Sequence, residues 1–432
     1  ALSIVIAGVP TGATLSAGTH NADGTWTLTP AQLTGLTITP PSNSDVDFDL
    51  TVTAIAKDGV AAEATKSETL HVTVDPVTDT PTLTVTSARG SEDTAIALTI
   101  NPALTDTDGS EALSIVISGV PTGAMLSAGT HNADGTWTLT PAQLSGLTIT
   151  PPSNSDVDFD LTVTAIAKDG VAIEATKSET LHVTVDPVTD TPTLSVTSAR
   201  GNEDTAIALT ISPALTDTDG SEALSIVIAG VPTGAILSAG THNADGTWTL
   251  TPAQLTGLTI TPPSNSDVDF TLTVTAIAKD GVATEATKSE TLRVTVDPVT
   301  DTPTLSVTSA RGDEDTAIAL TISPALTDTD GSEALTISIA GVPSGATLSA
   351  GTHNADGTWT LTPAQLTGLT ITPPANSDVD FTLTVTAIAK DGVATEATKS
   401  ETLHVTVDPV TDTPTLSVTA ASGNEDTAIA LA

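Results

Sequence analysis

The sequence predicts an all-β fold, a tandem array of immunoglobulin-like β-sandwich domains joined end to end. A unit of 111 residues recurs, and it carries tryptophan at Trp26, Trp137, Trp248 and Trp359. Within each unit, apolar residues alternate with threonine or serine, which is the period of a half-buried strand. Glycine and proline interrupt these segments every 8–12 residues or so, a spacing of about the size expected in a β-sandwich.

The repeat sets the expected domain boundaries. Copies 82–192 and 193–303 differ at nine of 111 positions. A unit of this length is a common domain size and can bury its own core. We therefore expect an N-terminally truncated domain at 1–81, complete domains at 82–192, 193–303 and 304–414, and the start of a further repeat at 415–432.

Strand signals fill the reference copy, 82–192. The alternating segments predict strands at 82–87, 112–118, 136–140, 147–150, 159–167 and 179–186. Residues 141–144 (PAQL) favour one helical turn, and Asn132-Ala-Asp134-Gly135 favours a hairpin turn. Helical periodicity is otherwise nearly absent, so the copy reads as roughly seven to nine strands.

Trp137 and Phe159 are the only Trp, Phe or Tyr residues in this copy. We expect Trp137 to anchor the core between two sheets. An exposed Trp137 would instead favour a multivalent glycan-binding module.

Charge and composition exclude several functions. Twelve Lys and Arg residues face 52 Asp and Glu residues, and the formal charge is −40. Binding to nucleic acid through phosphates needs the opposite balance, so no nucleic-acid partner is expected. The sequence contains no cysteine, and no apolar run reaches the length of a membrane span. No catalytic motif occurs, so the chain is not expected to be an enzyme.

A short connection separates consecutive units. Its sequence is DPVTDTP at 186–192, with counterparts at 75–81, 297–303 and 408–414. Two prolines in seven residues end the last strand and stiffen the extended connection. Neighbouring units should therefore bring their poles, the two ends of each sandwich, close together.

Acidic residues gather between the predicted strands rather than on strand faces. The last strand must end at the C-terminal pole, and the strand before it runs antiparallel. This places Glu92, Asp156 and Asp158 at the C-terminal pole of the reference copy. In the next copy it places Asp217, Asp219 and Asp280 at the N-terminal pole, and Asp186 and Asp190 lie in the linker between them.

These eight carboxylates should meet at one junction. Like charges at short range repel strongly unless a cation intervenes. Calcium takes about six to eight oxygen ligands, so we expect roughly two or three ions of Ca²⁺ per junction. Zinc would want His or Cys. Turn and strand-end chemistry, which also favours Asp, remains the alternative.

The repeat extends the predicted metal ligands to the other junctions. Before the reference copy they are Asp45, Asp47, Asp75, Asp79, Asp106, Asp108 and Asp169. After the third copy they are Glu203, Asp267, Asp269, Asp297, Asp301, Asp328, Asp330 and Asp391. At the end of the fourth copy they are Glu314, Asp378, Asp380, Asp408 and Asp412.

The segments EDTAIAL, DGTWTLTPAQL and DVDF resemble the cadherin-like and immunoglobulin-like extender repeats of giant bacterial surface adhesins, RTX-type proteins exported by type I secretion. In cadherins, matching positions carry a first-strand Glu, a paired acidic motif, a linker with two Asp, and Asp-x-Asp with a later Asp in the next domain. The linker departs in having Thr where Asn is usual.

This resemblance implies a calcium-stiffened stalk at the bacterial cell surface. Its partners would be neighbouring repeats of the same chain, and the adhesion target would bind elsewhere in the protein. A biofilm-matrix or filament subunit remains a further alternative.

Overall fold

The structure is a computed structural model that describes residues 1–431. The chain divides into two compact units. The first contains Ala1–Thr191 with Leu215–Ala223 and Ala278–Ala286, and the second contains Pro192–Ala214, Leu224–Ile277 and the chain from Thr287 onward. Leu215–Ala223 and Ala278–Ala286 come from the third repeat but group with the second. Each set of junction residues therefore lies inside one unit.

The second repeat shows the architecture in full. Its elements are β8 (Thr82–Thr86), β9 (Ala88–Ser91), β10 (Ile96–Ala97), β11 (Thr99–Ala103), β12 (Glu111–Ser118), β13 (Met125–Leu126), β14 (Thr130–His131), β15 (Trp137–Leu139), the 3-10 helix η2 (Pro141–Leu144), β16 (Thr148–Thr150), β17 (Phe159–Asp169) and β18 (Ala175–Asp186). All six predicted strands are confirmed, as is the single turn at 141–144. Five strands of two to five residues were not predicted, because such short segments carry little alternation.

The other repeats contain equivalent elements. The first has β1 (Leu2–Ala7), β2 (Thr14–Leu15), β3 (Thr19–His20), β4 (Trp26–Leu28), η1 (Pro30–Leu33), β5 (Ile38–Thr39), β6 (Phe48–Ala56) and β7 (Ala64–Val72). The third has β19 (Thr193–Thr197), β20 (Ala199–Asn202), β21 (Ile207–Ala208), β22 (Thr210–Ala214), β23 (Glu222–Ala229), β24 (Ile236–Leu237), β25 (Thr241–His242), β26 (Trp248–Leu250), η3 (Pro252–Leu255), β27 (Thr259–Thr261), β28 (Phe270–Asp280) and β29 (Ala286–Asp297).

The fourth has β30 (Thr304–Thr308), β31 (Ala310–Asp313), β32 (Ile318–Ala319), β33 (Thr321–Ala325), β34 (Glu333–Ala340), β35 (Thr347–Leu348), β36 (Thr352–His353), β37 (Trp359–Leu361), η4 (Pro363–Leu366), β38 (Thr370–Thr372), β39 (Phe381–Asp391) and β40 (Ala397–Asp408). No α-helix occurs among residues 1–431, and the search of these residues found no helix suited to crossing a membrane.

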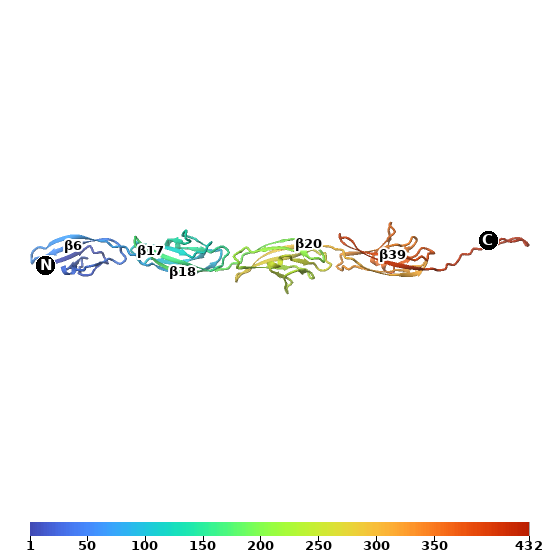
Figure 1. Ribbon diagram of the computed structural model, residues 1–432, viewed down its shortest axis with the longest axis horizontal. Coiled ribbons are helices and arrows are strands. Elements are labelled where there is room, and N and C mark those ends of the chain that lie inside the picture. The colour runs from blue at the N-terminus through green and yellow to red at the C-terminus, as the bar shows by residue number, and fades with distance from the viewer. Residues whose placement is uncertain (432) are drawn as a thin grey trace. The chain divides into compact units, whose positions relative to one another are not determined.

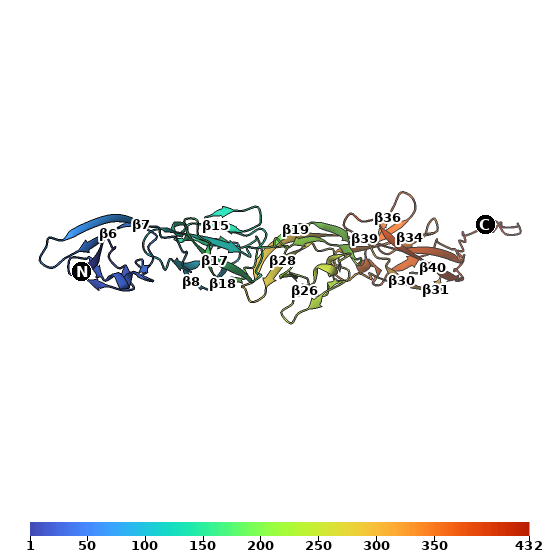
Figure 2. The same ribbon diagram turned by 60° about the vertical axis from the view of Figure 1, so that its left-hand side comes forward.

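Two layers of strands form each complete sandwich. In the second repeat one layer is a six-stranded sheet of order β14-β15-β12-β17-β18-β9, in which β17 and β18 lie side by side (Figure 1). The sheet β10-β16-β13 and the pair β8-β11 form the other layer. β9 runs parallel to the end of β18, whereas β17 and β18 are antiparallel. The fourth repeat follows the same order, with β34, β39 and β40 adjacent (Figure 2).

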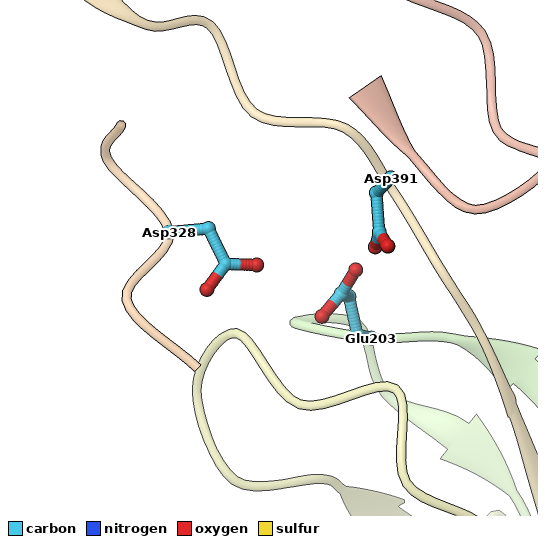
Figure 3. Close-up of side chains that lie close together, drawn as sticks. All are labelled: Glu203, Asp328 and Asp391. Carbon is cyan, nitrogen blue, oxygen red and sulfur yellow. The ribbon is translucent and has the colours of Figure 1, made fainter. Parts of the chain in front are cut away.

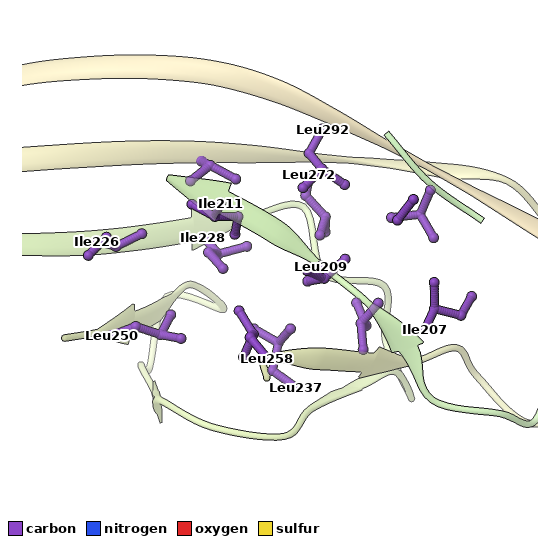
Figure 4. Packing of buried hydrophobic residues seen from close by; sticks show 14 of the residues in the cluster. Ile207, Leu209, Ile211, Ile226, Ile228, Leu237, Leu250, Leu258, Leu272 and Leu292 are labelled. Atoms are coloured by element: carbon purple, nitrogen blue, oxygen red, sulfur yellow. The ribbon is translucent and has the colours of Figure 1, made fainter. Parts of the chain in front are cut away.

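The core lies between the layers and follows the strand alternation. Leu161, Val163 and Ala165 of β17 are fully buried, and the residues between them face outward or are half-buried. Ile96 and Ile149 from the opposite layer belong to the same cluster. Figure 4 shows the equivalent packing in the third repeat, where side chains from both layers point into one apolar interior. The fold class predicted from the sequence is confirmed.

Trp137 lies at the margin of this core rather than at its centre. It is half-buried and packs against the cluster, and its ring stacks on His131 with 5.0 Å between ring centroids. The expected core anchor is therefore a partly buried one. Its stacking partner, on the edge strand β14, was not anticipated.

The first repeat and the segment 415–431 differ from the second, third and fourth repeats. The first strand of the chain, β1, is the counterpart of β12. The predicted further repeat, 415–432, forms no strand over its described residues 415–431, and Ala432 lies outside them.

Candidate metal centre

Every buried polar or charged side chain in the described chain is a carboxylate at a repeat pole. They are Glu92, Asp106, Glu111, Asp169, Glu203, Asp217, Glu222, Asp280, Glu314, Asp328, Glu333 and Asp391. A buried carboxylate costs free energy unless it is paired or bound to a cation. Their placement at the poles, with none in the apolar cores, agrees with the pole assignment made from the sequence.

Glu92 lies at the C-terminal pole of its repeat and forms a hydrogen bond with the linker. It follows β9, whose pairing with β18 carries it to the C-terminal pole. Its Oε1 atom accepts a hydrogen bond from Val188 N at 2.6 Å. Its Oε2 atom is buried and has no hydrogen-bond partner among the described residues. One oxygen therefore fixes the linker and the other remains available to a ligand.

The N-terminal pole of the next repeat supplies further carboxylates. Asp217 Oδ1 accepts a hydrogen bond from Asp219 N at 2.9 Å, so the Asp-Thr-Asp turn orients its side chain. The backbone N–H of Asp280 donates to Thr189 Oγ1 of the linker at 3.1 Å, which brings the end of β28 against the connection. Asp217 Oδ2 and Asp280 Oδ2 are both buried and unpartnered within residues 1–431.

The pKa values of Glu92, Asp217 and Asp280 show that these carboxylates influence one another. The pKa of Glu92 is raised to about 7, mainly by burial and in part by the charges of Asp217 and Asp280. Burial also raises the pKa of Asp280, with an added contribution from Asp156 of the preceding repeat. The pKa of Asp217 is raised by burial and, among its charged neighbours, by Asp219 and Asp190. A divalent cation would remove this repulsion.

The equivalent groups at the following junction lie closest together. One carboxylate oxygen from each of Glu203, Asp328 and Asp391 lies within 4.8 Å of the others. Figure 3 shows the three side chains pointing toward one another from three separate segments. Burial raises the pKa of Glu203 to about 7, and Asp391 and Asp328 contribute to the increase. Burial also raises the pKa of Asp391, with a contribution from Asp267.

Asp190 of the linker at the second junction is held in place by its neighbours. Its Oδ2 atom accepts a hydrogen bond from Asn154 Nδ2 at 3.0 Å, and Asn154 N donates to Asp93 Oδ1 at 2.9 Å. Asn154 and Asp93 have φ angles of 56° and 57°, in the left-handed region where Asn and Asp are the best tolerated non-glycine residues. Asn265 makes the same bond to Asp301 at 3.2 Å.

Other predicted ligands point elsewhere. Asp186 forms a two-pronged pair with Arg89, with N–O distances of 2.6 to 3.0 Å, and Asp297 and Asp408 pair in the same way with Arg200 and Arg311. The adjacent arginine lowers the pKa of Asp186. The structure therefore gives Asp186 a cationic partner within its own repeat.

The second aspartate of each DVD motif is also occupied. Asp158 Oδ1 accepts a hydrogen bond from Val185 N at 2.8 Å, and His182 Nε2 lies 3.8 Å from its other oxygen. Asp269 accepts from Val296 N and pairs with Arg293, at 3.0 and 2.8 Å. These carboxylates hold the final strand of the repeat. The same backbone bond is made by the remaining members of this position, Asp47 and Asp380.

The first junction and the last pole contain the remaining predicted ligands. At the first junction Asp45, Asp75, Asp79, Asp106 and Asp169 line a hollow of about 370 Å³. Burial raises the pKa of Asp169, and the charges of Asp45 and Asp108 add to the increase. At the last pole Glu314 accepts a hydrogen bond from Val410 N. Glu314, Asp378 and Asp412 face no folded repeat among the described residues.

Sequence reasoning missed two members of the cluster. Glu222, with its counterparts Glu111 and Glu333, was not among the predicted ligands. The signal was present, since each of these glutamates follows an Asp-Thr-Asp-Gly-Ser turn at the start of a strand. Asn154 had a weaker signal, because an Asn in a loop is common without any such role.

The donor set fits a hard divalent cation. At the second junction four of the unpartnered buried atoms are carboxylate oxygens, Glu92 Oε2, Asp217 Oδ2, Glu222 Oε2 and Asp280 Oδ2, and the fifth is the hydroxyl oxygen of Ser221. The sequence contains no cysteine, and in the hydrogen bonds described above no histidine contacts these four carboxylate oxygens. Calcium prefers oxygen ligands and a high ligand number, whereas zinc prefers nitrogen and sulfur.

Comparisons with known proteins give structural likeness only. No family model and no curated protein sequence matches the chain. Among solved structures it is similar to the extracellular cadherin domains 1–5 of protocadherin gamma B2, at 14% identity and TM-score 0.38, covering 93% of this chain and 72% of that one. Mouse cadherin-23 repeats EC22–24 match at 17% identity and TM-score 0.36, covering 77% and 99%.

The human desmocollin-1 ectodomain matches at 15% identity and TM-score 0.29, covering 98% of this chain and 78% of that one. These three structures are cadherin extracellular repeats. All three TM-scores lie below 0.5, so these likenesses assign no function to the chain.

Proposed function

We propose that this chain is the stalk of an extracellular adhesin, in which calcium held at the junctions between repeats stiffens the connection. The observation that carries the proposal is the convergence of buried, unpartnered carboxylate oxygens from two consecutive repeats on one short linker. The cation removes the repulsion between them and binds only when both poles are in place. By mass action it then stabilises the joined form.

The repetition itself supports a mechanical role. Nearly identical copies multiply length, and each added copy adds another junction. The pattern of buried charge is the same at the second and third junctions, with two glutamates and two aspartates buried at each. In this proposal the stalk projects an adhesive region of the same protein away from a bacterial cell surface, and the adhesion target binds elsewhere.

The test compares the full chain in calcium and in chelator. We expect calcium to raise the melting temperature and to change the small-angle scattering curve toward that of a more extended, less variable particle. Magnesium at the same concentration should do less, because it keeps its own waters and demands a stricter geometry. Identical melting temperatures and scattering curves in calcium and chelator would refute the proposal.

A local variant locates the effect. Replacing Asp217 and Asp219 together with alanine removes both side-chain carboxylates from the junction before the third repeat and leaves the other junctions unaltered. Hydrogen exchange in calcium should then increase in the linker at 186–192 but not in the linker at 297–303. Equal exchange in both linkers would argue against a site at each junction.

A further inference from the structure

One glutamate at each N-terminal pole adjoins the cluster but is absent from the ligands predicted from the sequence. Glu333 is the first residue of β34, and its counterparts Glu111 and Glu222 open β12 and β23. Glu333 is 8% exposed, so it is among the most buried charged side chains of the chain. No neighbouring cation compensates it, since its charged neighbours are Asp328, Asp301 and Asp391.

The two carboxylate oxygens of Glu333 are in different situations. Oε1 accepts a hydrogen bond from the backbone N–H of Asp301 in the linker, at 2.6 Å. Oε2 is buried and has no hydrogen-bond partner in the described part of the chain. Glu111 and Glu222 repeat both features, with bonds of 2.6 Å to Asp79 N and Asp190 N.

The strand register makes the arrangement costly without a ligand. Glu333 lies directly opposite Asp391 in the antiparallel pair of β34 and β39, and Glu111 lies opposite Asp169 in the same way. Like charges in directly opposite positions destabilise a sheet. Asp391 belongs to the group of three carboxylates whose oxygens lie within 4.8 Å of one another. Glu333 therefore adjoins that group across the strand pair.

We infer that Glu111, Glu222 and Glu333 are additional ligands of the junction cations and that they couple each cation to the linker. This inference rests on the proposed function. One oxygen of each glutamate holds the linker N–H, and the other binds the ion. Glu203 does the same from the preceding repeat, since its Oε1 accepts from Val299 N at 2.6 Å. The linker at 297–303 is thus held from both sides by glutamates that face the same cluster.

Replacement of all three glutamates by glutamine separates the two roles. Glutamine keeps an oxygen for the linker N–H but presents an amide nitrogen in place of the second oxygen, and that nitrogen cannot bind a cation. The matched control replaces Glu179, Glu290 and Glu401 by glutamine. These glutamates are half-exposed, with side-chain exposures of 39 to 40%, and pair with lysine, so the control removes the same charge away from the junctions.

Calorimetric titration of the full chain with calcium is the first measurement. We expect the junction variant to bind at least tenfold more weakly or to take up fewer ions, and the control to match the wild type. Affinity and stoichiometry equal to those of the wild type would overturn the inference and leave the proposed function standing. Absence of calcium binding by the wild type would overturn both.

The second measurement compares the melting temperature of the junction variant with that of the wild type, in chelator and in calcium. In chelator the junction variant should melt at a higher temperature than the wild type, because three buried charges are gone. In saturating calcium it should melt at a lower temperature than the wild type. If these glutamates have only a structural role, their replacement should shift the melting temperature in the same direction in chelator and in calcium. If the triple variant folds poorly, the single variant Glu333→Gln takes its place. Hydrogen exchange of the 297–303 linker in calcium should then be faster in this variant than in the wild type, and equal exchange would overturn the inference.

Discussion

Glu203→Gln should change stability in opposite directions with and without calcium. Burial and the charges of Asp391 and Asp328 raise the pKa of Glu203 from 4.5 to about 7. In the absence of calcium, the folded state therefore holds a proton over a pH range in which the unfolded state has released it. The resulting stability is present below about pH 4.5 and is lost as the pH rises through about 7.

The size of the effect follows from the shift. Each pKa unit corresponds to about 1.4 kcal/mol, so a rise from 4.5 to about 7 corresponds to an upper limit of about 3 kcal/mol. Solvent near the linker screens part of this, which leaves about 1–3 kcal/mol. At pH 8 in chelator, Glu203→Gln should be more stable than the wild type by that amount. At pH 4.5 the two should be equal.

Scanning calorimetry at pH 4.5 and 8, with calcium or with chelator, measures the change. In saturating calcium at pH 8 the variant should be the less stable one, because it has lost a carboxylate ligand. Glu290→Gln, which removes a half-exposed charge paired with Lys288, is the control and should show neither effect. The reasoning is wrong if Glu203→Gln lowers stability in chelator at pH 8, or if its effect there is the same at both pH values.

Three further outcomes follow from the fold. If Asp186 serves only as the partner of Arg89, the double variant Arg89→Asp with Asp186→Arg should recover the calcium affinity that Asp186→Arg alone loses. A calcium titration that shows no recovery in the double variant would identify Asp186 as a ligand. Leu181→Ala should destabilise the second repeat by about 2–5 kcal/mol in calorimetry, because this side chain is 0% exposed in the core. Gly119→Ala should destabilise by more than about 1 kcal/mol in chemical denaturation, because its φ is +82° and a Cβ atom would lie 2.6 Å from a backbone oxygen of β17.

Much of the fold was readable from the alternation of apolar and polar residues. The strands at 112–118, 159–167 and 179–186 were predicted within a few residues, because each is long enough to show the period of two. The strands β9, β10 and β13 were not predicted, because two to four residues show no period. Trp137 was expected in the core, but it is only half-buried, since its neighbour β14 is an edge strand.

The candidate site was predictable to the level of the pole but not of the side chain. Strand direction placed Glu92, Asp156 and Asp280 together. The raised pKa values of Glu92 and Asp280 reflect that proximity, because Asp280 contributes to the first and Asp156 to the second. Asp186 could not be separated from Asp190 by sequence, because both are linker aspartates. The difference comes from Arg89, which is 97 positions away from Asp186 in the sequence.

The sequence by itself determined the all-β class, the 111-residue period and the concentration of acid between strands, because these depend on local patterns and on counting strand directions. Only the tertiary structure decided which carboxylates are buried, which are paired with arginine, and which retain an unpartnered oxygen. The physical reason is that burial and pairing are set by segments far apart in the chain. The parallel contact of β9 with β18 brings Glu92 to the linker, and the register of β34 with β39 sets Glu333 against Asp391.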